Sequence, residues 1–143
     1  MNDKSRIYAA FLGAWTLIPE SCRFEQGDPP ISGSYYITDN DGRLTFLMDW
    51  VDAEGRSHQA TLEGIPNGGK VPFNGGEIAD ALSIKAVSPR ELNSSAYYKG
   101  QERMTAQRQL DDTGEGMRVT QVVRFPDGSR QANVSIYRKQ KIQ

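Results

Sequence analysis

Apolar and polar residues alternate along short segments of the chain, which is the pattern of strands with one buried face. Across 44–51 the even positions carry Leu44, Phe46, Met48 and Trp50. Across 130–138, Ala132, Val134 and Ile136 alternate with polar residues. A period of two is expected of half-buried β-strands, so we take the apolar positions to face a common interior.

Turn-forming residues separate these segments at short intervals. Asp39-Asn40-Asp41-Gly42 and Pro126-Asp127-Gly128-Ser129 are the strongest examples. Glycine, Asn and Asp supply the positive φ angles of tight hairpins, and proline presets the first corner. The pattern predicts nine strands and a possible short tenth, near 13–24, 33–38, 43–51, 56–64, 79–87, 92–99, 102–110, 117–125 and 129–138, with the short one near 71–74.

Short connections predict that each strand pairs with the next. A meander of this length leaves two exposed edges unless it closes, so we expect an all-β, antiparallel up-and-down β-barrel of 8–10 strands. A short N-terminal helix capped by Asn2 or Asp3 precedes it. A Greek-key sandwich would need long crossovers with an apolar pattern, which the two longer connections lack. Residues 1–143 are expected to form a single domain.

Composition narrows the function. The 17 Lys+Arg residues nearly balance the 18 Asp+Glu residues, which disfavours a nucleic-acid binder and a polybasic membrane anchor. With Cys22 as the single cysteine, no internal disulfide and no cysteine-based zinc site forms. No apolar stretch has the length of a membrane span. We expect a cytoplasmic protein, monomeric or homodimeric, with no cofactor and no metal.

Gly13-x-Trp15, placed after the predicted helix and at the start of the first strand, resembles the Gly-x-Trp motif of the lipocalins and related calycin barrels. The resemblance implies that Gly13 and Trp15 are structural and that Trp15 lies under the helix at the closed end. It also implies a basic residue from the end of the last strand against the indole, and we assign that role to Arg138. A cation over an indole contributes about 0.5–1 kcal/mol.

Several side chains share the phase of the inward apolar positions and are our candidates for ligand contact: Phe46, Met48, Trp50, His58, Tyr98, Met104, Arg108 and Gln121. Intracellular fatty-acid-binding barrels hold a carboxylate with interior arginine and tyrosine, so the resemblance implies that role for Arg108 and Tyr98. An inward arginine needs a partner or an anionic ligand. The alternative is that Arg108 lies near the rim and extends to water.

Other features leave alternatives open. His58, the single histidine, is either a rim residue or a haem ligand of the kind some small calycin-like barrels use. The segment 64–76, which contains Phe73, is either a portal over the open end or a plain connection. No catalytic motif is present, although Tyr98, Arg108 and Glu102 form a conceivable set for a lyase or isomerase.

These observations predict a barrel that binds a small hydrophobic or amphipathic molecule in its interior. One alternative is a small barrel enzyme, a lyase or isomerase acting on a hydrophobic acid. The other is a barrel filled by its own side chains that acts as an interaction module. The volume of the interior cavity distinguishes the ligand-binding barrel from the filled barrel, since ligand binding needs a cavity of roughly 300 Å³ or more.

Overall fold

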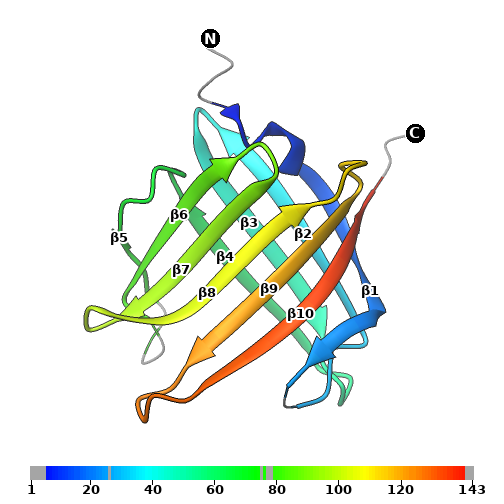
Figure 1. The fold of residues 1–143 in the computed structure, drawn as a ribbon, viewed down its shortest axis with the longest axis vertical. Coiled ribbons are helices and arrows are strands. Elements are labelled where there is room, and N and C mark those ends of the chain that lie inside the picture. The colour runs from blue at the N-terminus through cyan, green and yellow to red at the C-terminus, as the bar shows by residue number, and fades with distance from the viewer. Residues whose placement is uncertain (1–5, 26, 75, 77–78, 141–143) are drawn as a thin grey trace.

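The computed structural model describes residues 6–25, 27–74, 76 and 79–140. Within these residues, the strands form a single antiparallel sheet that curls into a barrel (Figure 1). The strands are β1 (Gly13–Phe24), β2 (Ser32–Asn40), β3 (Arg43–Val51), β4 (Ser57–Gly64), β5 (Val71–Pro72), β6 (Ala81–Ser88), β7 (Glu91–Tyr98), β8 (Gln101–Leu110), β9 (Gly116–Arg124) and β10 (Arg130–Lys139).

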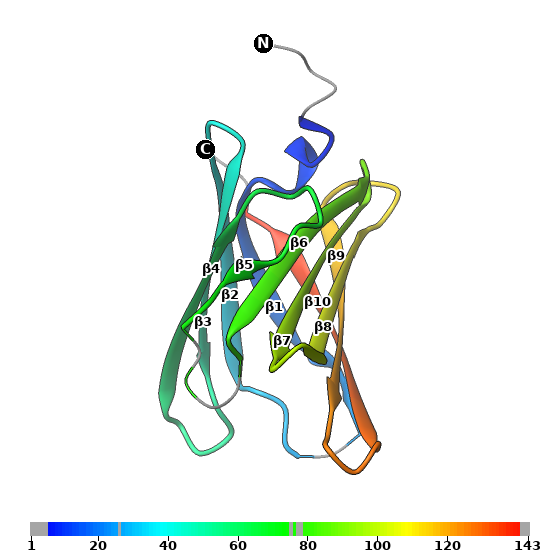
Figure 2. The ribbon, with the colours of Figure 1, turned by 90° about the vertical axis from the view of Figure 1, so that its left-hand side faces the viewer.

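The first and last strands of the chain, β1 and β10, pair with each other and so make one continuous sheet. The strand order is β4-β3-β2-β1-β10-β9-β8-β7-β6-β5, with Leu17 of β1 opposite Tyr137 of β10. The seam lies between β4 and β6, where β5 is only two residues long (Figure 2). At one end of the seam the Gly68 N–H donates to the Ile84 carbonyl at 2.8 Å. The barrel is therefore nearly closed, as the meander pattern predicts.

The structure confirms the predicted architecture. Every predicted strand is present, with ends that differ from the expected ranges by no more than two residues. The predicted helix caps, Asn2 and Asp3, lie outside the described residues. In the described chain, a 3₁₀ turn, Ala9–Phe11, lies directly before β1.

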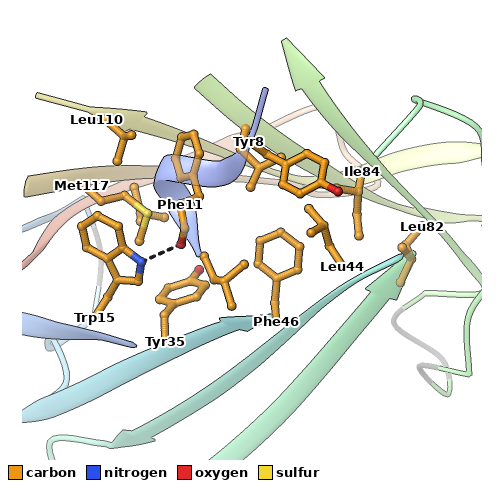
Figure 3. Packing of buried hydrophobic residues seen from close by; sticks show 13 residues of the cluster. Tyr8, Phe11, Trp15, Tyr35, Leu44, Phe46, Leu82, Ile84, Leu110 and Met117 are labelled. Carbon is orange, nitrogen blue, oxygen red and sulfur yellow. Dashed lines mark hydrogen bonds between the residues drawn. The ribbon is translucent and has the colours of Figure 1, made fainter. Parts of the chain in front are cut away.

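Buried residues gather under this turn, at the end of the barrel that we call the closed end (Figure 3). Trp15, Phe11 and Tyr8 are almost fully buried there. The Trp15 Nε1–H donates to the Phe11 carbonyl at 2.9 Å, which ties the turn to β1. Phe46, Leu44, Ile84 and Met117 fill the space below. The closed half of the barrel is consequently a packed core.

The cation over Trp15 is Lys139, and the assignment of Arg138 is wrong. Trp15 is paired with Lys139 across β1 and β10, and the Lys139 Nζ lies 5.4 Å from the indole centroid. It also donates to the Ala10 carbonyl at 3.0 Å. Arg138 is one position earlier, so it points outward and is exposed. A one-residue difference in register exchanges the two faces of a strand.

This register predicts unequal effects for two neighbouring substitutions. We expect Lys139→Met to lower the free energy of unfolding by about 0.5–1 kcal/mol, because it removes the cation–π contact and the bond to the 3₁₀ turn. Arg138→Met, the matched control, should leave it within about 0.5 kcal/mol of the parent. Urea denaturation measures both. A larger loss for Arg138→Met would contradict the register.

The last strand also reverses the expected orientation of its alternating faces. Tyr137 points inward, since its ring makes an edge contact with buried Tyr35 at 4.9 Å. By alternation, Gln131, Asn133 and Ser135 face the interior as well. Ala132, Val134 and Ile136 therefore face outward, and Ile136 is exposed. The expectation that their apolar side lines the interior is wrong.

Candidate ligand-binding site

Arg108 lies inside the barrel and is almost fully buried, at 1 % relative exposure. It extends from β8 toward the opposite wall, where its guanidinium carbon lies 4.6 Å from the Phe46 ring centroid and 5.4 Å from that of Tyr35. Nη1 donates to the Ser94 hydroxyl at 3.0 Å and Nη2 to the Tyr35 hydroxyl at 3.4 Å. Nε has no hydrogen-bond partner among the described residues. Arg108 therefore does not lie at the rim.

The groups around the Arg108 charge are neutral. None of the ion pairs among the described residues includes Arg108. Burial raises the pKa of the nearby Tyr137 hydroxyl well above its usual range, and the charge of Arg108 offsets only part of that rise. Burial also raises the pKa of the Cys22 thiol. The site is consequently a buried cation with neutral hydroxyls beside it.

Arg108 marks the boundary between the packed closed half and a more open half. Its row across the sheet contains Leu92 and Val119, both buried. The next inward positions toward the open end are Ala106 and Gln121, which are only partly buried. Most of the other inward-facing residues of the open half are also only partly buried, and several of them are small: Met48, Trp50, Ala60, Ala96, Met104, Val123 and Asn133. Ser94 and Leu82, which lie in the rows of Ala106 and Ala96, are buried. Alanine side chains facing inward leave room that larger ones would fill.

Of the predicted tyrosine–arginine pair, the structure brings only Arg108 to this boundary. Tyr98 pairs with Gln101 beside the β7–β8 turn, whereas Arg108 pairs with Leu92 at the other end of β7. Six residues of strand separate those positions by about 20 Å. Tyr35 of β2 takes the place expected of Tyr98. Pairing Tyr98 with Arg108 is therefore wrong.

The other predicted site residues divide between the two halves. Phe46 is fully buried and packs against the Arg108 guanidinium. Met104 accepts a hydrogen bond on Sδ from the Gln121 side chain at 2.8 Å. His58 is exposed near the open end, where Nε2 lies 2.7 Å from Asp52 and the ring stacks on Trp50 at 5.3 Å.

The set proposed for catalysis is not assembled. Glu102 lies opposite Tyr97 near the open end, with its carboxylate 3.7 Å from Arg124. Arg108 is six residues away along the same strand, and it faces the interior. Phe73, the lid candidate of the segment 64–76, packs partly buried against the core cluster.

Comparison with known proteins supports the fold. No known sequence family and no curated protein matches the chain. Among the solved structures that share its fold at low sequence identity are the following three. They are zebrafish ileal bile acid-binding protein complexed with cholic acid (TM-score 0.56, 12% identity, 92% of this chain and 99% of that one), the S-type phycobiliprotein lyase of Guillardia theta (0.60, 10%, 98% and 94%), and a de novo designed fluorescence-activating β-barrel (0.52, 13%, 98% and 100%). The chain has a calycin-like barrel fold.

Two hollows adjoin this calycin-like barrel. The first, of about 390 Å³, lies where β1 ends and is lined by Cys22, Arg23, Phe24, Glu25, Gly27 and Pro29. Phe24 is paired with the inward-facing Asn133, which places this hollow beside the open end of the barrel. The second, of about 410 Å³, lies on the outside of the closed end, lined by Arg6, Tyr8, Asp41, Gly42, Ile65, Pro66 and Asn67. Neither of these two hollows is lined by Arg108 or by the inward-facing residues of β3, β4, β7, β8 and β9.

Sequence reasoning missed several side chains that surround Arg108 and line the open half: Tyr35, Ser94, Asn133, Ser135 and Tyr137. Tyr35 is in phase with Ile37, which was a usable signal of an inward position. Ser94 is likewise in phase with Leu92. The alternation along β10 was misleading for Asn133, Ser135 and Tyr137, because the apolar residues of this strand face outward. Among the described residues, no helix is long and apolar enough to cross a membrane.

Proposed function

We propose that the open half of the barrel binds a small amphipathic anion, with its anionic group at Arg108 and its apolar body against β3 and β4. The observation that carries this proposal is the burial of Arg108 without an acidic partner among the described residues. A charge taken out of water without a counter-charge is costly. A bound anion supplies the missing counter-charge.

The geometry indicates where the anion would lie. Ser94 is one inward position closer to the open end than Leu92, and Arg108 donates to its hydroxyl. The guanidinium is therefore directed toward the open half. Its Nε–H has no partner among the described residues, and the Tyr35 hydroxyl, which accepts from Nη2, keeps its own proton as a further donor. Carboxylates accept two or more such charge-assisted hydrogen bonds at once.

Proteins of the same fold lend support. The zebrafish bile acid-binding protein holds cholic acid, which is an amphipathic carboxylate. The free, buried Cys22 fits a location in the cytoplasm. A lyase or isomerase has less support, because Tyr98 and Glu102 lie away from Arg108. An interaction module built on a filled barrel has less support too, because several inward residues of the open half, such as Ala60, Ala96 and Ala106, are small and only partly buried.

A matched pair of probes tests the anionic requirement. Laurate and 1-dodecanol share one alkyl chain and differ in the head group, so any cost of placing that chain in the barrel cancels in their ratio. Charge-assisted hydrogen bonds contribute about 1.5–3 kcal/mol, so we expect laurate to bind about 10- to 100-fold more tightly. Isothermal titration calorimetry below the micelle concentration measures both. Equal affinities, or no binding of either probe, would overturn the proposal.

A further inference from the structure

We infer that the ligand carries hydrogen-bonding groups along one side of its body, in addition to its anionic group. This inference rests on the proposed function, since it concerns the same interior. It follows from the inverted orientation of β10. A plain hydrocarbon body would leave one wall of the barrel without partners, whereas a two-sided body would match both walls.

A line of polar side chains, which we call the polar stripe, runs along the interior face of β10 and continues onto β9: Gln121, Gln131, Asn133 and Ser135. Asn133 and Gln121 lie directly opposite each other across the two strands. Gln121 contacts Met104, which places this pair on the inward side. Positions two apart on a strand are about 7 Å apart, so the three residues of β10 span about 14 Å.

Two members of the polar stripe are poorly paired within the protein. The Asn133 Oδ1 atom is buried and has no hydrogen-bond partner among the described residues. The Gln121 amide donates to the Met104 thioether, which is a weak acceptor. Buried amide groups normally have good partners, because an unmade bond costs free energy. These two groups are therefore available to a ligand.

The wall formed by β3 and β4 has the opposite character. Its inward side chains Met48, Trp50, Ala60 and Leu62 are apolar and partly buried, and the exposed His58 stacks on Trp50 where this face reaches the open end. Figure 1 shows β9 and β10 in front of β3 and β4, so the polar stripe faces this apolar wall across the barrel. The interior thus presents one polar side and one apolar side to the same ligand. A body with hydroxyl groups on a single face fits such an interior.

Two steroid carboxylates test the inference without changing the protein. Cholate and 5β-cholanoate share a skeleton and a carboxylate, and only cholate has hydroxyl groups, which lie on one face. An apolar interior would favour the more hydrophobic 5β-cholanoate. We expect the parent protein to bind cholate at least as tightly as 5β-cholanoate, measured by isothermal titration calorimetry.

Substitutions in the polar stripe should change this preference. Gln121→Leu and Asn133→Leu each remove a partner of the ligand hydroxyls, so we expect the ratio of the two affinities to move about tenfold toward 5β-cholanoate. Gln59→Leu is the matched control: it makes the same change on the outer face of β4, where Gln59 contacts Asp49 and is exposed. Its ratio should equal that of the parent.

The outcomes separate the two proposals. A strong preference of the parent for 5β-cholanoate, or an unchanged ratio in both stripe variants, would overturn the inference. The proposed function would survive that result if laurate still bound more tightly than 1-dodecanol. If neither the steroids nor laurate bind, the proposed function falls, and the inference falls with it.

Discussion

Trp15→Ala is expected to lower the free energy of unfolding by about 3–5 kcal/mol, which is the usual cost of truncating a buried tryptophan. Trp15 is fully buried at the closed end, and its indole N–H is bonded to the Phe11 carbonyl. The substitution therefore opens a cavity and releases the 3₁₀ turn that covers the barrel. Urea denaturation followed by circular dichroism measures the change.

Trp15→Phe separates the two contributions. It keeps an aromatic ring in the core but removes the donor, so the Phe11 carbonyl loses its partner. We expect the loss of stability in Trp15→Phe to be smaller than the loss in Trp15→Ala, and the two losses to differ by at least roughly 1–2 kcal/mol. If Trp15→Ala lost under about 1 kcal/mol, the closed end would not depend on this residue, and the structural role inferred from Gly13-x-Trp15 would be wrong.

The fold could be predicted because it depends on local signals. Alternation with a period of two marks the strands, and Gly with Asn or Asp marks the turns, so each element is visible within a few residues. The absence of long crossovers then favours a meander that closes. The predicted ranges consequently agree with the strands of the barrel, from Gly13–Phe24 to Arg130–Lys139.

The orientation of β10 could not be predicted from local pattern. Ala132, Val134 and Ile136 are the apolar positions of that strand, yet they face outward. Pairing with β9 and with β1 sets the register, and it turns Tyr137 toward Tyr35 in the interior. The same register exchanges the roles expected of Arg138 and Lys139. A strand whose partners are distant in sequence is oriented by tertiary packing.

The candidate site, like the fold, could be predicted from the sequence only in part. Arg108 was identified because it shares the phase of Met104, Ala106 and Leu110 along one strand. Its partner Tyr35 is 73 residues away in sequence and lies across the barrel. No local pattern connects β2 with β8, since they are not neighbours in the sheet. Tyr98 shares the alternation of the inward-facing residues of β7. The alternation of side chains, however, does not show how far along the barrel axis a side chain lies.

Arg108→Met should raise the free energy of unfolding by about 1–2 kcal/mol while weakening the binding of amphipathic carboxylates about 10- to 100-fold. Methionine has a similar length and no charge to desolvate, and apolar replacements of buried ionic groups often stabilise proteins by about 1–4 kcal/mol. No buried counter-charge is left behind, because Arg108 has no acidic partner among the described residues. Loss of the contacts with Phe46, Tyr35 and Ser94 offsets part of the gain. Chemical denaturation and calorimetry with laurate measure the two effects.

Arg108→Lys is the informative control, because it keeps the charge and removes the planar fork of donors. It should bind laurate with an affinity between those of the parent and Arg108→Met, and it should gain no stability, since the buried charge remains. If Arg108 is retained in order to bind an anion, replacing it with methionine should increase stability and weaken binding. If Arg108→Met instead lost stability and bound laurate as tightly as the parent, Arg108 would be part of the packed core alone, and the anion would have to bind elsewhere in the barrel.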